Sequence, residues 1–178
     1  MSGDQQTNGV KVFLGLGGNV GDVIANFKSA LQMLDATANQ HLVRVSPVYR
    51  TPPWGDENQD WFYNACAQLQ SQQSPMDLLK QCKMIETDLK RQKTRRWGPR
   101  SIDIDILIYG DLEKDLQSLT LPHPRMLERT FVLKPLADIA ADTIVSGKSI
   151  QHWLDCHGEV ELERIDLADD WYQIKEKL

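Results

Sequence analysis

Two aspartates, Asp103 and Asp105, stand one residue apart inside an isoleucine-rich segment that ends at Tyr109. Alternate side chains of a β-strand point to opposite faces, so this spacing predicts that the segment's four isoleucines share one face and both aspartates the other. Their Cα atoms would lie roughly 7 Å apart, close enough for the carboxylates to share a cation. Oxygen ligands beside a phosphate substrate favour Mg²⁺. The alternative is a solvated sheet face, although aspartate is disfavoured in strands.

A basic segment precedes the two aspartates. Residues 90–100 contain six lysines and arginines and no acidic residue, although the net charge of the chain is −5. Guanidinium groups next to a bound metal can neutralise a polyphosphate. The segment therefore predicts a polyphosphate site beside the metal, and the alternative is an ordinary solvated loop.

A glycine-rich segment, residues 15–21, follows a predicted strand and precedes a predicted helix. In the dinucleotide-binding fingerprint G-x-G-x-x-G, Val20 would occupy the position of the third glycine. No Gly-Lys-Ser/Thr follows, so the segment is not a P-loop either. We interpret it as a tight turn before the helix.

The elements that must position these residues can be read from apolar periodicity. Ser74, Pro75 and Asp77 mark the start of the clearest helix, as cap, first residue and acidic first turn. Strands are predicted over residues 10–16, 43–49, 61–69 and 102–109, and helices near residues 20–38, 74–89, 129–140 and 149–156. This order predicts an α+β fold, a ferredoxin-like βαββαβ sandwich with an antiparallel sheet and additional C-terminal helices. One sheet face would remain available for a site.

Bulk properties limit the remaining possibilities. The chain has 178 residues, and we expect a flexible N-terminal extension over residues 1–9 and a single domain over residues 10–178. No apolar run is long enough for a membrane span, and the negative net charge argues against binding to nucleic acid or anionic lipid. The three cysteines lack CxxC spacing, which fits a reducing cytoplasm. Cys156 with His152 and His157 is too loose a group for a metal site. We expect a monomer.

Taken together, these segments resemble the 6-hydroxymethyl-7,8-dihydropterin pyrophosphokinase family of folate biosynthesis, from about Val10 to Ala140. The most specific segment reads Arg-Trp-Gly-Pro-Arg-x-x-Asp-x-Asp, from Arg96 to Asp105. The other matching segments are Gly17-Gly18-Asn19, Tyr49 to Gly55, Phe62 to Ala65, and Leu121-Pro122-His123 through Arg129 and Phe131.

The resemblance implies that ATP donates its terminal pyrophosphate to the pterin hydroxymethyl group and leaves as AMP. It further implies that Asp103 and Asp105 hold two Mg²⁺ ions and that Arg91 and Arg100 are catalytic arginines that grip the phosphate. The implied ATP contacts are Glu86, Arg91, Arg100, His123 and Arg129. We expect ATP to bind first and to organise residues 51–59 and 92–100 before the pterin enters.

The resemblance also implies a pterin pocket, in which aromatic rings stack on the flat substrate and an amide reads its edge. Its residues would be Thr51, Pro52, Trp54, Phe62, Asn64, Trp97 and Phe131. Without the resemblance, Phe62 and Phe131 would be taken for core aromatics and His123 for a surface residue.

The chain departs from the family pattern at three places. The basic loop is one residue shorter, which leaves Lys93 and Arg95 without an assigned role; Trp54 is larger than expected; and the tail after about Gly158 matches little. Two other functions stay open at this point: another DxD-type nucleotidyl- or glycosyltransferase, and an RNA-binding module on a ferredoxin-like fold.

Overall fold

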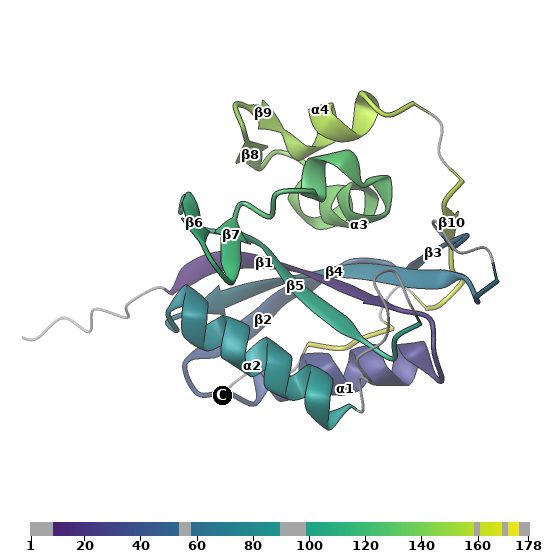
Figure 1. Cartoon of the computed structure of the whole chain (residues 1–178), viewed down its shortest axis with the longest axis horizontal. Coiled ribbons are helices and arrows are strands. Elements are labelled where there is room, and N and C mark those ends of the chain that lie inside the picture. The colour runs from purple at the N-terminus through teal and green to yellow at the C-terminus, as the bar shows by residue number, and fades with distance from the viewer. Residues whose placement is uncertain (1–8, 54–57, 90–98, 159–160, 169–170, 175–178) are drawn as a thin grey trace, which may run out of the picture.

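A six-stranded antiparallel sheet forms the centre of the computed structural model, which describes residues 9–53, 58–89, 99–158, 161–168 and 171–174. Helices α1 and α2 lie on one face of this sheet, and α3 and α4 lie on the other (Figure 1). The sheet strands are β1 (Val10–Gly18), β2 (Gln40–Val45), β3 (Tyr49–Thr51), β4 (Phe62–Ser71), β5 (Asp103–Tyr109) and β10 (Glu163–Arg164). The helices are α1 (Val23–Asp35), α2 (Pro75–Asp88), α3 (Thr130–Ala140) and α4 (Ile150–Asp155). Two small hairpins, β6 (Lys114–Leu116) with β7 (Leu119–Leu121) and β8 (Ile144–Val145) with β9 (Lys148–Ser149), and a 3₁₀ turn (Met126–Glu128) complete the chain.

The strand order confirms the predicted ferredoxin-like topology. β1 lies between β4 and β5, and β2 pairs with the other side of β4, with every pairing antiparallel. The predicted strand over residues 43–49 is wrong in one respect, because the structure divides this region into β2 and β3, and both pair with β4. Pro47 lies in the break and has no N–H to donate to the ladder. Ser46 bridges the gap, since its hydroxyl accepts a hydrogen bond from the backbone N–H of Cys66.

The predicted start of α2 is confirmed. Ser74 is the N-cap, its hydroxyl accepts from the backbone N–H of Asp77, and Pro75 is the first helical residue. The first helix is shorter than predicted, because Asp22 caps it at Val23 and it ends at Asp35. No helix in the described ranges is apolar over enough residues to reach across a bilayer.

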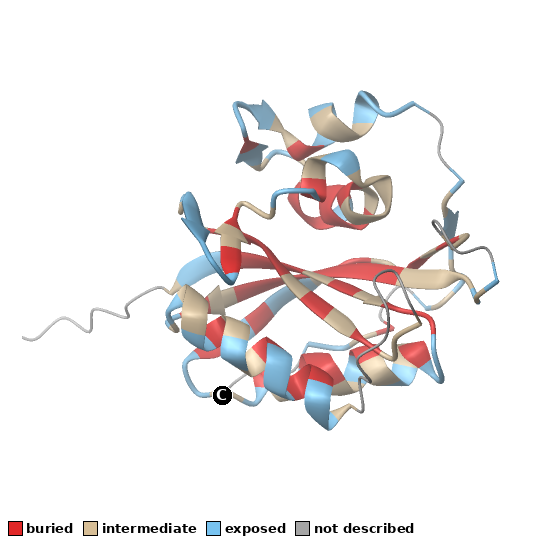
Figure 2. Cartoon of the chain, in the orientation of Figure 1, coloured by how far each residue is buried: buried red, intermediate tan, exposed pale blue. Residues whose placement is uncertain are grey.

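The sheet has an apolar cluster on each face (Figure 2). The larger one packs α1 and α2 against the sheet and includes Leu14, Phe27 and Leu78. The second cluster joins Phe13 and Leu107 of the sheet to Leu133 and Leu136 of α3. The expectation that the second face stays open is therefore wrong for the part of the sheet beneath α3.

An irregularity in β5 changes the direction of one predicted side chain. Phe13 pairs with Ile108 while the next residue, Leu14, pairs with Ile106, so Leu107 is the extra residue of a β-bulge. Leu107 and Ile108 both join the α3-side cluster, whereas Ile104 and Ile106 stay in the larger one. The prediction that all four isoleucines share one face is therefore wrong for Ile108.

The C-terminal segment adds to the core, although its sequence matched little. β10 pairs with β3, and the backbone N–H of Ile165 donates to the carbonyl of Val48. Trp171 is buried in the larger cluster, and its indole N–H donates to the carbonyl of Ser46 at 2.8 Å. These hydrogen bonds hold the backbone at Ser46 and Val48, on either side of Pro47, where β2 and β3 separate.

We predict that Trp171→Ala lowers the free energy of unfolding by about 3 kcal/mol, because it leaves a large cavity and an unpaired carbonyl. Chemical denaturation measures this change. The control is Ile174→Ala, at a side chain that is 37% exposed, which should change stability by less than about 0.5 kcal/mol. Equal effects of the two substitutions would contradict a core role for Trp171.

Candidate active site

The two aspartates lie on the α3 side of β5, beside two glycines of β1. In the β1–β5 register, Gly15 is opposite Asp105 and Gly17 is opposite Asp103. On the other side of β1, Gly17 is opposite Asn64 of β4. A Cβ atom on Gly17 would lie 3.6 Å from the Asn64 side-chain oxygen. Gly17 therefore places no side chain between Asn64 and Asp103, whereas a Cβ atom on Gly15 would lie 3.4 Å from the Leu107 side chain.

This finding corrects the interpretation of the glycine-rich segment. β1 continues through Gly18, so Gly15 and Gly17 are strand residues, and the turn begins only at Asn19. The alternation of these glycines with Leu14 and Leu16 was the signal that the sequence offered for a strand.

The aspartates repel each other in a poorly solvated place. Burial and the neighbouring Asp103 both raise the pKa of Asp105, while His123, Lys83 and Arg100 act against this rise. The Asp103 side chain is only 16% exposed and pairs with the guanidinium of Arg100 at 3.4 Å. Two carboxylates of this kind favour a bound cation, since it removes the repulsion between them.

Arg100 lies between the aspartates and an aromatic ring. Its guanidinium carbon is 5.3 Å from the centre of the Phe62 ring. Its Nε atom is buried and has no hydrogen-bond partner among the described residues. A buried donor without an acceptor is costly, so an oxygen atom of a bound anion would stabilise this side chain.

His123 and Arg129 face the same aspartates from the segment between β7 and α3. Burial lowers the pKa of His123, although Asp105 acts in the opposite direction. The His123 Nδ1 atom accepts a hydrogen bond from the backbone N–H of Arg125, so the neutral ring carries its proton on Nε2. Burial also lowers the pKa of Arg129, against the attraction of Asp105. Both residues can thus donate hydrogen bonds to an anion above the aspartates.

A second group of predicted residues lies on β3, β4 and α3. Thr51 is opposite Phe62 in the ladder, and the Asn64 amide donates to the Thr51 hydroxyl at 3.5 Å. Asn64 and Thr51 are buried, whereas Phe62 and Phe131 are half-buried and belong to neither apolar cluster. Phe131 lies in the first turn of α3, with the Arg129 guanidinium 5.8 Å from its ring centre. The reading of these two rings as core aromatics is therefore wrong.

Glu86 is placed differently from the other predicted ATP contacts. It is buried on α2, where its carboxylate accepts the backbone N–H of Ile104 at 2.7 Å and pairs with Lys83 at 3.0 Å. It therefore anchors the outer edge of β5. A contact with the nucleotide stays a prediction for this residue.

Three predicted residues lie outside the described ranges, namely Trp54, Arg91 and Trp97, as do Lys93 and Arg95. Pro52 follows β3 directly and is half-buried.

Within the described residues, no group of three or more His, Cys, Asp and Glu side chains could hold a metal. A pair of carboxylates fits Mg²⁺, which substrate phosphates and water also ligate, better than Zn²⁺.

Sequence reasoning missed the role of Asn19, which appeared only as part of a motif. Its side chain is buried, accepts the backbone N–H of Arg100 at 3.0 Å, and donates to the carbonyl of Asp60 at 3.1 Å. Its own backbone N–H donates to the Arg100 carbonyl. Asn19 thus connects the end of β1 to Arg100 and to the residues before β4.

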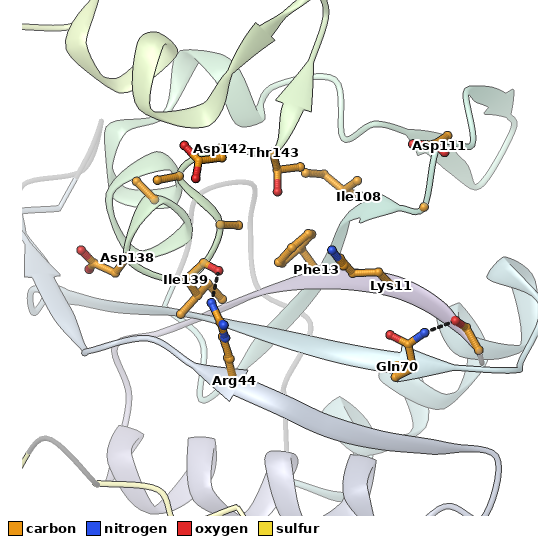
Figure 3. Close-up of a pocket in the computed structure, with 15 residues that line it drawn as sticks. Lys11, Phe13, Arg44, Gln70, Ile108, Asp111, Asp138, Ile139, Asp142 and Thr143 are labelled. Carbon is orange, nitrogen blue, oxygen red and sulfur yellow. Dashed lines mark hydrogen bonds between the residues drawn. The ribbon is translucent and has the colours of Figure 1, made fainter. Parts of the chain in front are cut away.

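A separate pocket of about 820 Å³ lies at the other end of the same sheet face (Figure 3). Lys11 and Phe13 of β1, Arg44 of β2 and the C-terminal residues of α3 line it. None of the predicted site residues contributes to this pocket.

The chain is similar to proteins of known activity. The model of the 7,8-dihydro-6-hydroxymethylpterin-pyrophosphokinase (HPPK) family matches residues 13–141. The chain is 43% identical to a 2-amino-4-hydroxy-6-hydroxymethyldihydropteridine pyrophosphokinase of Methylorubrum extorquens, over 88% of this chain and 99% of that protein. Its identity to the Synechocystis protein of the same name is 40%, over 82% and 74% of the two chains. A solved Plasmodium falciparum HPPK-DHPS structure with pteroate has a TM-score of 0.67 at 15% identity and supports the fold alone. The match covers 83% of this chain and 44% of that one.

We predict that Asp105→Asn raises the thermal stability of the metal-free protein at pH 7. The raised pKa of Asp105 means that its ionised form opposes folding, and this cost is absent at pH values below the ordinary aspartate pKa. The advantage of the variant should therefore shrink as the pH falls toward 3.8, the ordinary value. Thermal melts in EDTA measure this difference. A variant less stable than the wild type at pH 7 in EDTA would show that the carboxylate stabilises the fold.

Proposed function

We propose the roles of individual residues on the premise that the chain belongs to the 7,8-dihydro-6-hydroxymethylpterin-pyrophosphokinase family. It is an enzyme of folate synthesis that transfers pyrophosphate from ATP to 6-hydroxymethyl-7,8-dihydropterin. The products are AMP and the pterin diphosphate. The observation that carries the assignment of the site is the pair of aspartates that share one strand face beside Gly15 and Gly17.

Asp103 and Asp105 would hold the metal, for which we propose two Mg²⁺ ions. The donor set fits, since both groups are carboxylates and the raised pKa of Asp105 reflects a repulsion that a cation would relieve. When bound there, Mg²⁺ would supply positive charge that offsets the negative charge of the phosphate oxygens. Gly17, opposite Asp103, carries no side chain that would compete with a phosphate chain for the space next to this carboxylate.

Arg100, His123 and Arg129 would bind the phosphate oxygens that the metal leaves uncovered, together with Arg91. The support is the Nε atom of Arg100, which has no partner in the part of the chain that the structure describes, and the proton on Nε2 of neutral His123. A neutral histidine can donate to an anion without adding a charge beside Arg129. Charge-assisted hydrogen bonds of this kind position the β-phosphorus for in-line attack by the pterin oxygen.

The pterin would lie between Phe62 and Phe131, with its polar edge toward Asn64 and Thr51. The two half-buried rings offer faces for stacking, and the buried amide offers both a donor and an acceptor. Asn64 is opposite Gly17, which in turn is opposite Asp103. This register supports a pterin over β4 and a metal over β5, the two strands that flank β1, so that only the width of β1 would separate them. Pro52, Trp54 and Trp97 are proposed to close this pocket and to exclude water.

We further propose that residues 10–178 act as one cytoplasmic, monomeric domain without nucleic-acid partners. The C-terminal strand β10 joins the same sheet as β1, which supports a single domain. Cys66 and Cys82 are buried free thiols, which fits a reducing compartment. The exposed large apolar residues of the described ranges come from separate parts of the chain, which fits a monomer. They are Val10, Val20, Val43, Met84, Leu116, Ile144 and Ile174.

The reaction predicts a specific pair of products. Incubation with ATP, Mg²⁺ and the reduced hydroxymethyl pterin should give AMP and pterin diphosphate in equal amounts, and EDTA should stop the reaction. Anion-exchange chromatography separates the nucleotides. ADP or free pyrophosphate in place of AMP would point to another class of transferase.

The proposed catalytic roles predict different losses in two variants. Asp103→Ala should lower kcat by at least about 10³-fold, because the metal loses a ligand. Arg91→Ala should lower kcat by about 10²- to 10³-fold and leave pterin affinity within about 3-fold, since it acts on the breaking bond. Steady-state kinetics and pterin titration measure both effects.

Asp115→Ala and Arg164→Ala are the matched controls. Asp115 lies on the exposed β6 strand and Arg164 on β10, and both have exposed side chains. Both controls should keep wild-type kcat. Near-normal turnover of Asp103→Ala or Arg91→Ala would refute the role of that residue.

A further inference from the structure

The two sides of the proposed pterin slot belong to different layers of the fold. Phe62 and Asn64 lie on β4, with Thr51 beside them on β3, whereas Phe131 lies on α3 above the sheet (Figure 1). The separation of the two aromatic rings therefore depends on how α3 is seated relative to β3 and β4. Contacts between α3 and the sheet near this slot decide how well a flat ring fits.

Apolar contacts seat the inner side of α3. Leu133 and Leu136 are fully buried against Phe13 and Leu107. Such contacts hold the helix close to the sheet, but they are non-directional. They leave the rotation and tilt of α3 to be fixed by other interactions.

A polar group provides a directional contact on the β3 side. The Tyr49 hydroxyl donates to one carboxylate oxygen of Asp138 at 2.6 Å, and the Lys134 ammonium group donates to the other at 2.8 Å. The Lys134 nitrogen also lies 5.6 Å from the centre of the Tyr49 ring. Tyr49 is only 4% exposed, so its ring is fixed by packing. Asp138 itself is an exposed residue, but the 2.6 Å hydrogen bond to its carboxylate is charge-assisted and directional.

The sequence positions of these residues connect them to the slot. Lys134 and Asp138 follow Phe131 by three and seven positions, so the three residues share one face of α3. On the sheet, Tyr49 is two residues before Thr51 and is opposite Asn64. One polar contact thus joins the strand that carries Thr51 to the helix face that carries Phe131. Asp138 lies about two helical turns from Phe131, roughly 10 Å along the axis, at the rim of the pocket in Figure 3.

We propose that Tyr49 and Asp138 are positioning residues that set the width of the pterin slot. This inference rests on the proposed pterin site between Phe62 and Phe131. Neither residue touches the pterin. They act by fixing the rotation and tilt of α3 relative to β3, so that Phe131 stands at the stacking distance from the ring below.

The test is Tyr49→Phe, which keeps the buried ring and removes the hydroxyl. We expect the Kd for the pterin, measured with a non-hydrolysable ATP analogue and Mg²⁺ present, to rise roughly 5- to 20-fold. The Kd for the ATP analogue should stay within about 2-fold, because neither Tyr49 nor Asp138 is among the residues proposed to bind the phosphates. Asp138→Ala should reproduce the loss, and the double variant should lose no more than either single variant. Asp138→Asn keeps an oxygen acceptor and should restore most of the affinity.

Tyr109→Phe is the matched control for a purely structural effect. Tyr109 is also a buried tyrosine, and its hydroxyl donates to the backbone carbonyl of Gln73 on the other side of the sheet. This variant loses a comparable hydrogen bond and should lower the melting temperature without changing the pterin Kd. A loss of pterin affinity in Tyr109→Phe equal to that in Tyr49→Phe would overturn the proposal.

Wild-type pterin affinity in both Tyr49→Phe and Asp138→Ala would also overturn it. Phe131→Ala separates this failure from a failure of the proposed site. If Phe131→Ala weakens pterin binding and the other two variants do not, the site stands and the positioning role is wrong. If Phe131→Ala binds the pterin normally while the enzyme still produces AMP, the pterin lies elsewhere and both are wrong.

Discussion

The site depends on two carboxylates that one strand holds on the same face, in a place where solvent does not fully stabilise their charge. Burial and mutual repulsion raise the pKa of Asp105, and Arg100 pairs with Asp103. A fold that keeps such a pair must hold β5 firmly. It does so from both sides, through the β1 ladder on one edge and the buried carboxylate of Glu86 on the other. A cation would relieve the repulsion between the two carboxylates.

The rest of the site follows from alternation along antiparallel strands. Once Asp103 and Asp105 face α3, the register places Gly17 and then Asn64 in the same row across the sheet. Because Gly17 has no side chain, no side chain of β1 separates Asp103 from Asn64 in this row. The phosphate chain of ATP would lie beside Asp103 and the polar flat ring of the pterin beside Asn64. The transferred group would then pass above Gly17. The proposed site therefore combines residues that lie opposite one another on three adjacent strands, and not residues that follow one another along a single strand.

Much of this could be predicted from local sequence, and the failures have physical causes. The Ser74 cap and the shared face of the two aspartates follow from neighbours along the chain. The binding roles of Asn64 and Phe131 come from the resemblance and stay predictions, although Phe131 does lie outside both apolar clusters. The break between β2 and β3 and the bulge at Leu107 depend on partners in β4 and β1, which one-dimensional periodicity does not contain. Glu86 illustrates the same limit, because its buried carboxylate is bound to a backbone N–H eighteen positions later. The contribution of Trp171 to the core was invisible because the apolar residues around it come from distant elements.

Backbone hydrogen bonds hold one part of the site and side-chain contacts hold another, so amino-acid substitutions should affect the two parts differently. The aspartates and Asn64 are fixed by backbone ladders, whose hydrogen bonds join main-chain groups and not side chains. The helix that carries Phe131 is fixed by side-chain contacts, which each substitution alters. Metal and phosphate geometry should therefore be the rigid part of the site. The proposed pterin slot is bounded on one side by a helix that rests on apolar packing and a carboxylate contact. Small changes in this packing should therefore alter pterin affinity without moving the phosphate chain.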